Sequence, residues 1–326
     1  MAKKKVIIIG AGHAGLSAYE VLARESNLCQ VTIISEETHL RYSPTSTPYL
    51  LSDLVGLYPL YGLPLTPFLG TEKVSTGKIP PGEQEYPASD CNYLILKKRV
   101  IQIIPQEKKV LLEDGTHLSY EALIICTGAQ PSSFSVTGQE AANVFRLQSQ
   151  SDVENVLAVA KEAGKAVIIG AGAVGIEAAL SLARQGLEVI VVEKNGQVLP
   201  GYFDGEAGKT IQTLLETKGL EFYLNNTVVN IKQDEAGQVC SVSLADGKDL
   251  NCDLVIMATG VQSNTSVVKD SGIEINRGIL VNERMETSCQ DIYAAGDVAE
   301  TRGFFPDQKT VLPTLIDAVE QGRVAA

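Results

Sequence analysis

The chain has 326 residues, 44% of them apolar and 20% charged, a composition ordinary for a globular protein of about two domains. Its formal net charge of −12 argues against nucleic acid and anionic membranes as partners, because like charges repel, and leaves a basic protein partner open. After M-A-K-K-K the apolar run ends at a glycine, too short for a signal peptide, and no stretch reaches the roughly 18 apolar residues of a membrane span. We therefore expect a soluble, cytoplasmic protein.

The cysteines and histidines indicate neither disulfides nor a metal. Six cysteines stand at positions 29, 91, 126, 240, 252 and 289 without a C-x-x-C pair, and the three histidines are equally scattered. We expect no disulfide framework and no metal site.

The chain opens with a predicted β-α-β unit. Val6 to Ile9 form a short, β-branched run typical of a buried parallel strand, and Gly10, Gly12 and Gly15 follow at G-x-G-x-x-G spacing before a helical stretch. The first glycine permits a tight turn, the second admits a pyrophosphate to the backbone, and the third allows close helix packing. The helix N-terminus then faces the phosphates, so we predict a dinucleotide site.

An acid follows the second predicted strand. Val31 to Ile34 make this strand, and Glu36 ends it where a carboxylate accepts hydrogen bonds from a ribose. The alternative is a glycine-rich turn without a ligand. Residues 37–51 contain two prolines and suit a loop. Residues 56–88 show no helical or strand period, so we expect residues 56–88 to be irregular and assign no site to them.

The next stretch predicts a hairpin and a buried strand. Lys98 to Ile104 and the segment K-V-L-L-E-D-G-T-H-L read as strands, with Asp114-Gly115 as the turn. E-A-L-I-I-C-T-G follows as a buried strand that ends at Gly128. Ser151 to Glu162 is amphipathic and predicts a helix.

The same plan then repeats. Gly170, Gly172 and Gly175 each stand 160 residues after their counterparts in the first loop, and the strand V-I-V-V-E ends in Glu193. The hairpin and the strand ending in Thr-Gly recur at a constant offset of 132, closing at Gly260. The chain is therefore predicted to be a duplicated nucleotide-binding fold. T-S-C-Q-D-I-Y-A-A-G-D, which follows, is expected to return it to the first domain.

Five motifs in this order resemble the FAD- and pyridine-nucleotide-dependent oxidoreductases, which include disulfide reductases, NADH oxidases, and rubredoxin and ferredoxin reductases. They are the two glycine loops with their acids, C-T-G at 126–128, A-T-G at 258–260 and A-A-G-D at 294–297. The resemblance implies an α/β fold of two Rossmann-like three-layer domains, the second inserted in the first. Residues 1–145 plus 262–326 would bind FAD, and residues 146–261 would bind NAD(H).

The resemblance also implies the cofactor-binding residues. In this family the first loop holds the ADP half of FAD, the second holds the nicotinamide cofactor, and the aspartate of the G-D motif binds the ribityl chain; a turn or helix cap is the alternative for that aspartate. No catalytic residue is assigned. The predicted cofactor-binding residues are Gly10, Gly12, His13, Ala14, Gly15, Glu36, Arg41, Val100, Thr127, Gly128, Gly170, Gly172, Val174, Gly175, Glu177, Glu193, Gly260, Gly296, Asp297 and Pro313.

The last stretch predicts a helix near the flavin. L-P-T-L-I-D-A-V-E-Q-G-R suits a helix with Pro313 at its first position, and its positive end would stabilise the anion of reduced flavin. The alternative is an ordinary packing helix.

The sequence departs from the family pattern in three places, which limits what the resemblance implies about the activity. Thr45 stands where disulfide- and peroxide-reducing members carry a cysteine, residues 56–88 lack the expected amphipathic helix, and the sequence stops at Ala326 before a C-terminal domain that often forms a dimer. We expect either a truncated chain or a partner subunit in that place.

The predicted function is an oxidoreductase that takes hydride from NADH onto FAD and passes electrons to an acceptor other than a disulfide. A small iron protein such as rubredoxin or ferredoxin, or another subunit, would be that acceptor. An NADH oxidase or CoA-disulfide reductase-like enzyme is the alternative. A non-catalytic flavin-binding subunit, with a structural or redox-sensing role, is the alternative of another class.

Overall fold

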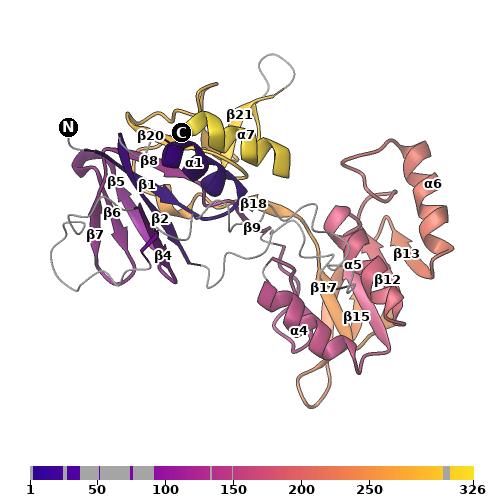
Figure 1. The fold of residues 1–326 in the computed structure, drawn as a ribbon. Coiled ribbons are helices and arrows are strands. Elements are labelled where there is room, and N and C mark those ends of the chain that lie inside the picture. Colours follow the sequence, from indigo (N-terminus) through magenta and orange to yellow (C-terminus); the bar gives the residue numbers. More distant parts are fainter. Residues whose placement is uncertain are drawn as a thin grey trace. The chain divides into compact units, whose positions relative to one another are not determined.

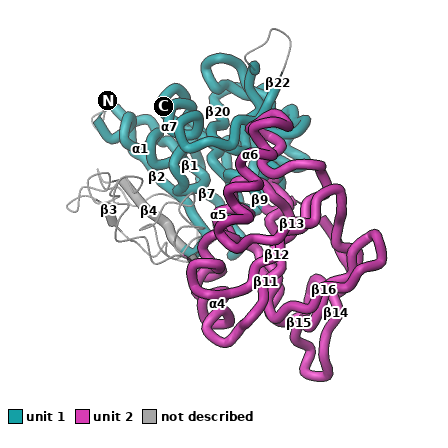
Figure 2. The backbone as a smooth tube through the Cα atoms, turned by 90° about the vertical axis from the view of Figure 1, so that its right-hand side faces the viewer, with its two compact units in different colours: residues 1–43, 62–130, 262–326 teal, residues 44–61, 131–261 magenta. Residues whose placement is uncertain are grey.

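The computed structural model describes residues 3–24, 28–36, 51, 97–132, 134–148, 150–303 and 309–326, with only the backbone of 74–75, 92–96 and 150. The chain divides into two compact units (Figures 1 and 2). The described residues within 1–43, 62–130 and 262–326 form unit 1, and those within 44–61 and 131–261 form unit 2. The second unit is thus inserted in the first, as the family resemblance implies.

Unit 1 is built on a six-stranded sheet in the order β20-β8-β1-β2-β4-β3, with every neighbouring pair parallel. Its strands are β1 (Lys4–Ile9), β2 (Cys29–Ser35), β3 (Val74–Ser75), β4 (Asn92–Leu96), β8 (Ala122–Ile125) and β20 (Ile292–Ala294). The short strand β20 pairs with β8, so the segment before A-A-G-D returns the chain to the first sheet as expected.

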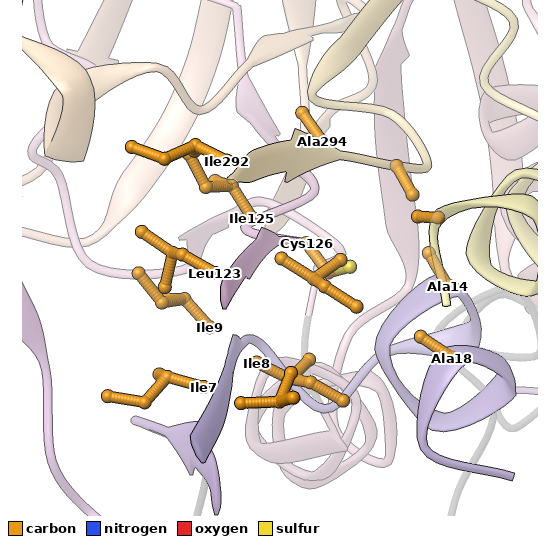
Figure 3. Packing of buried hydrophobic residues seen from close by; sticks show 14 of the residues in the cluster. Ile7, Ile8, Ile9, Ala14, Ala18, Leu123, Ile125, Cys126, Ile292 and Ala294 are labelled. Carbon is orange, nitrogen blue, oxygen red and sulfur yellow. The ribbon is translucent and has the colours of Figure 1, made fainter. Parts of the chain in front are cut away.

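Two helices and a small sheet complete the core of unit 1. Helix α1 (His13–Arg24) packs against α7 (Leu315–Ala325), and the antiparallel sheet of β5 (Val100–Ile104), β6 (Lys109–Leu112) and β7 (His117–Ser119) contributes to the same core. Figure 3 shows isoleucines of β1 beside Leu123 and Ile125 of β8, with Ala14 and Ala18 from α1. A central strand with both faces buried has to be apolar throughout, as V-I-I-I is.

Smaller elements complete unit 1. They are a sheet of β19 (Ile279–Leu280), β21 (Ala299–Arg302) and β22 (Lys309–Thr310), and two 3-10 turns, η3 (Pro105–Glu107) and η4 (Ser266–Val268). Strands β9 (Ala129–Pro131) and β18 (Val261–Ser263) pair where the chain passes from one unit to the other.

Unit 2 repeats the plan of unit 1. Its five-stranded sheet has the order β10-β17-β11-β12-β13, again all parallel, and an antiparallel sheet β14-β15-β16 accompanies it. The elements are β10 (Val144–Phe145), α4 (Gln150–Ala160), β11 (Lys165–Ile169), α5 (Ala173–Arg184), β12 (Glu188–Glu193), α6 (Gly205–Glu216), β13 (Leu220–Leu224), β14 (Val228–Gln233), β15 (Val239–Leu244), β16 (Asp249–Asn251) and β17 (Leu254–Met257).

Alternation along the strands of unit 2 creates its three layers. Ala166 and Ile168 of β11 join a core with buried residues of α4 and α5. Val167 and Ile169, whose side chains point the other way, join a second core with β14, β15 and β16. The sheet therefore lies between helices on one face and an antiparallel sheet on the other, which confirms the predicted three-layer α/β fold.

The division between units falls earlier in the chain than the predicted boundary at residue 145. Residues 131–145 belong to unit 2, because β10 pairs with β17 and an isolated bridge joins Thr137 to Asn230. A sequence boundary placed just before the helix start overlooks a two-residue edge strand. Within the described part of the chain, no helix is long and apolar enough to cross a membrane.

Candidate nucleotide-binding sites

The first glycine loop joins β1 to α1 and cannot hold side chains at two of its three glycines. Gly10 has φ +102°, and a Cβ there would lie 2.1 Å from the carbonyl oxygen of Cys126. A Cβ on Gly15 would lie 2.1 Å from the carbonyl oxygen of Gly10. These two glycines are therefore needed for the turn and for helix packing, the roles predicted from their spacing.

Gly12 differs, since a Cβ there would meet no atom of the described residues within 4 Å. None of those residues requires a glycine at this position, so the open space in front of the backbone fits a ligand group. It lies at the start of α1, where the N–H groups of a first helical turn and the helix dipole favour a phosphate. Ala14 is buried and His13 partly so, and burial lowers the pKa of His13, which keeps its ring neutral near pH 7.

Glu36 follows β2 directly and is exposed. Its Oε2 accepts a hydrogen bond of 2.6 Å from Nε of Arg99, and the side chains are 53% and 63% exposed. This pairing raises the pKa of Arg99. One side of the carboxylate is thus held, while its exposure leaves it accessible to hydroxyl groups.

The C-T-G segment is fixed by residues that follow unit 2 in the sequence. The hydroxyl of Thr127 donates to the carbonyl of Asn264 at 2.7 Å, and the amide of Asn264 donates to the carbonyl of Gly128 at 2.9 Å. Gly128 has φ +64° with open space beside it. Val100 is buried at the start of β5, next to Arg99.

The A-A-G-D segment carries the partly buried carboxylate of Asp297. Gly296 has φ +80°, and its amide donates to Oε1 of the buried Gln321 at 2.9 Å. Burial raises the pKa of Asp297, and its own backbone N–H lowers that pKa less. A carboxylate in such surroundings suits neutral hydroxyl donors such as those of a ribityl chain.

Helix α7 begins two residues after the predicted position. Thr314 is its N-cap, with φ −122° and ψ 152°, and its hydroxyl accepts from the amide of Asp317 at 3.1 Å. Pro313 therefore precedes the cap and is not the first helical residue, which corrects the prediction. A T-x-x-D spacing competes with proline as a start signal, and here the side-chain cap decides the boundary.

The second glycine loop, between β11 and α5, has nearly the same geometry. Gly170 has φ +109° and its Cβ would lie 2.3 Å from the carbonyl oxygen of Ala258, while a Cβ on Gly175 would lie 2.0 Å from that of Gly170. Gly172 has open space and is the N-cap of α5 without a side-chain cap. Val174, 44% exposed, and the half-buried Glu177 lie in the first turns.

Glu193 at the end of β12 is buried and built into this loop. Its Oε2 accepts from the amide of Ala171 at 2.7 Å, and its Oε1 accepts from the amide and Nδ2 of Asn195 at 2.9 and 2.6 Å. Gly260, in the second T-G segment, has φ +94°, and a Cβ there would meet no atom of the described residues within 4 Å.

Three of the five described cysteines are buried, whereas Cys240 is exposed and Cys289 is half-buried. Cys29, Cys126 and Cys252 are buried, and burial raises the pKa of Cys126 and of Cys252 to about 12. Among the described residues, no three His, Cys, Asp or Glu side chains group as metal ligands would. Arg41, Thr45, Cys91 and most of 56–88 lie outside the described residues.

Two nucleotide-type loops on one chain, each with an open glycine at a helix start, define the class of two-dinucleotide oxidoreductases. The model of the pyridine nucleotide-disulphide oxidoreductase family matches residues 4–322, and the chain belongs to this family. It is an FAD-dependent oxidoreductase that uses NAD(H), as the sequence predicted.

Named relatives share most of the chain. An NADH oxidase of Methanocaldococcus jannaschii is 31% identical over 98% of this chain and 69% of its own. Subunit epsilon of the NADH-dependent phenylglyoxylate dehydrogenase of Aromatoleum evansii is 30% identical over 98% and 71%. The solved ferredoxin reductase of Rhodopseudomonas palustris, 26% identical, aligns with a TM-score of 0.84 over 98% of this chain and 74% of that one.

Five residues near these sites were not predicted from the sequence: Arg99, Asn195, Ser263, Gln321 and Gly322. A Cβ on Gly322 would lie 2.2 Å from the carbonyl oxygen of Ala14, so this glycine lets α7 approach the start of α1. Ala318 and Gly322 are four residues apart, a small-residue spacing that signals close helix contact.

Proposed function

We propose that unit 1 binds FAD through the loop at Gly10, Gly12 and Gly15 with Glu36 and Asp297, and that unit 2 binds NADH through the loop at Gly170, Gly172 and Gly175 with Glu193. The observation that carries the proposal is that a Cβ on Gly12 or on Gly172 would meet no atom within 4 Å in the part of the chain that the structure describes. Each faces a helix start, as a bound pyrophosphate requires.

The chemistry follows from holding two ring systems in one protein. NADH supplies a hydride and FAD accepts it, and both can react only when their rings are held at contact distance. The start of α7, capped by Thr314 with Asp317 in its first turn, is proposed to lie at the flavin. The residues of this chain supply binding and orientation, while the cofactors carry the electrons.

The proposed acceptor is a protein, either a small iron protein or another subunit of a redox complex. Support comes from the names of two relatives, the epsilon subunit of a dehydrogenase and a ferredoxin reductase. The NADH oxidase among the relatives favours oxygen as a second candidate acceptor. A cytoplasmic location stays a prediction from the sequence.

Anaerobic NADH titration tests the proposal. The purified protein should show a flavin absorption spectrum that bleaches on NADH addition, and it should reduce an artificial dye with steady turnover. Oxygen uptake without dye would identify the oxidase, and flavin that NADH does not bleach would indicate the non-catalytic subunit.

Three alanine variants make the test specific to the loops. Gly12→Ala should lower flavin content, and Gly172→Ala should raise the NADH concentration needed for bleaching, because each methyl occupies the proposed phosphate space. Gly201→Ala is the control, since Gly201 also has nothing within 4 Å but lies outside both loops. Equal behaviour of all three variants would contradict the assignment.

A further inference from the structure

The main chain around Asp297 is fixed by hydrogen bonds on both sides. Before it, the amide of Ala295 donates to the carbonyl of Ile125 at 3.0 Å, and the amide of Gly296 donates to Gln321 at 2.9 Å. After it, the carbonyl of Asp297 accepts from Oγ of Ser263 at 2.6 Å. The backbone is therefore held, and only side-chain rotation remains free.

The two side chains that provide this hold come from distant parts of unit 1. Gln321 lies on α7 and is 7% exposed, next to the glycine through which α7 contacts α1. Ser263 ends β18, and the next residue, Asn264, is bonded to Thr127 and Gly128. Ser263 and its neighbour thus connect the C-T-G and A-A-G-D segments, which both lie in the domain that the resemblance implies binds FAD.

We propose that Ser263 and Gln321 are positioning residues that aim the Asp297 carboxylate at the ribityl chain of FAD. This inference rests on the proposed function of unit 1. Neither side chain needs to touch the cofactor, because a hydrogen bond to each neighbouring backbone group fixes the direction of the Cα–Cβ bond of Asp297. The carboxylate then accepts from ribityl hydroxyls without losing further conformational freedom, which improves affinity.

The remaining surroundings of Asp297 support this role. The causes that shift its pKa are burial, which raises it, and its own backbone N–H; no cationic side chain of the described residues contributes. A carboxylate without a neighbouring cation has its direction set by the backbone rather than by an ion pair. Neutral hydroxyl donors then complete its hydrogen bonding.

The test compares FAD with ADP as ligands of the apoprotein. ADP carries the pyrophosphate and adenosine but no ribityl chain, so it reports on the glycine loop alone. Asp297→Ala should weaken FAD binding by tens-fold, about 1.5 to 3 kcal/mol for a hydrogen bond to a charged group. Ser263→Ala and Gln321→Ala should each weaken FAD binding by about three- to tenfold and leave ADP binding within about twofold.

Further variants separate positioning from simple stability. Ser263→Thr and Gln321→Glu keep the donor and the acceptor oxygen and should restore FAD binding. Ser266→Ala is the matched control and should leave both ligands unaffected, because within the described residues its hydroxyl donates to the side chain of Asn264 at 2.8 Å and not to the main chain at Asp297. In an Asp297→Ala background, Ser263→Ala and Gln321→Ala should add no further loss, since they act through the missing carboxylate.

The outcomes test the positioning role of Ser263 and Gln321 separately from the proposed FAD site. If Ser263→Ala and Gln321→Ala weaken ADP as much as FAD, or if their effects add to that of Asp297→Ala, the positioning role is wrong while the FAD site stands. If Asp297→Ala keeps wild-type FAD affinity, the assignment of Asp297 fails, and the inference fails with it. Should Gln321→Ala not fold, Ser263→Ala and Gln321→Glu still decide.

Discussion

The two glycine loops are nearly identical in backbone and differ in how each holds its acid. Gly10 and Gly170 have φ +102° and +109°, and their Cβ atoms would lie 2.1 and 2.3 Å from a carbonyl oxygen of the neighbouring strand end. Glu36 is exposed and bonded to an arginine side chain, whereas Glu193 is buried and accepts from the backbone amide of Ala171 within the loop itself.

This difference separates ligand binding from loop structure. An exposed ion pair contributes little to stability, so Glu36 is free to act mainly on a ligand. A buried carboxylate that satisfies a buried amide is part of the fold, so Glu193 has two tasks at once. Duplicated sequence motifs therefore do not imply equal energetic roles for the acids that end their second strands.

The largest expected effect is the same in both units. Gly10→Ala and Gly170→Ala should each destabilise the nucleotide-free protein, since the left-handed backbone costs about 1 to 2 kcal/mol and the backbone overlap about 1 to 3 kcal/mol more. Thermal unfolding followed by circular dichroism should show a lowering of about 5 to 15 °C. Gly12→Ala and Gly172→Ala are the controls and should melt near wild type; melting as low as the first pair would refute the open-space interpretation.

Removing the acid at the end of the second strand should destabilise unit 2 more than unit 1. Glu193→Ala leaves the amide of the fully buried Ala171 without its acceptor, which costs about 1 to 3 kcal/mol. Glu36→Ala removes only a surface pair and should cost about 0.2 to 1 kcal/mol. Urea unfolding of the nucleotide-free proteins measures both. Equal losses in the two variants would mean that the hydrogen bond in unit 2 carries no weight.

Cofactor choice extends the comparison to binding. The carboxylate of Glu193 can accept from a free ribose 2′-hydroxyl and repels a 2′-phosphate, so kcat/KM should favour NADH over NADPH by about tenfold, or 1.4 kcal/mol. The exposed Lys194 would attract a 2′-phosphate, so Lys194→Ala should increase the preference for NADH. Glu193→Gln keeps an acceptor for the amide of Ala171 but removes the charge, so it should reduce the preference for NADH. NADPH used as well as NADH by the wild type would disprove the role of Glu193.

Among the charged contacts, the ion pair between Arg99 and Glu36 should contribute least to stability. Arg99→Ala should lower stability by about 0.2 to 1 kcal/mol, and the difference from wild type should vanish in 1 M salt, where the screening length is about 3 Å. Arg99→Lys cannot offer the Nε donor and serves as the comparison. A loss that persists unchanged at high salt would show that Arg99 acts through packing instead.

The sequence was sufficient to predict features that depend on a short segment, but not the hydrogen-bond partners that come from distant segments. Glycine spacing was sufficient for both loops, because a positive φ and a close carbonyl are demands within one short segment. The partners of the acids and of Asp297 were not foreseen. Arg99 stands 63 residues from Glu36, and Ser263 stands 34 residues from Asp297, distances that no period or spacing connects. The start of α7 was misplaced although T-L-I-D carried the cap, because proline was given more weight than the threonine that follows it.

The smallest expected effect concerns the thiol that distinguishes the two T-G segments. Cys126 occupies in unit 1 the place of Ala258 in unit 2, and each carbonyl oxygen lies beneath the first glycine of its loop. The thiol is buried and its pKa is raised to about 12, so it stays protonated and unreactive near pH 7. Cys126→Ala makes the first segment match the second and should leave flavin reduction and dye turnover unchanged.

The electron count gives this last prediction a second measurement. Wild type and Cys126→Ala should each take up about one equivalent of NADH per flavin, without the long-wavelength thiolate-to-flavin absorption of a disulfide reductase. Alkylation of the NADH-reduced protein should leave dye reduction nearly intact, because the exposed Cys240 lies on β15 of the antiparallel sheet and belongs to neither glycine loop. Uptake of two equivalents, or inactivation by alkylation only after reduction, would restore the disulfide reductase as the favoured function and place a reactive thiol at the flavin.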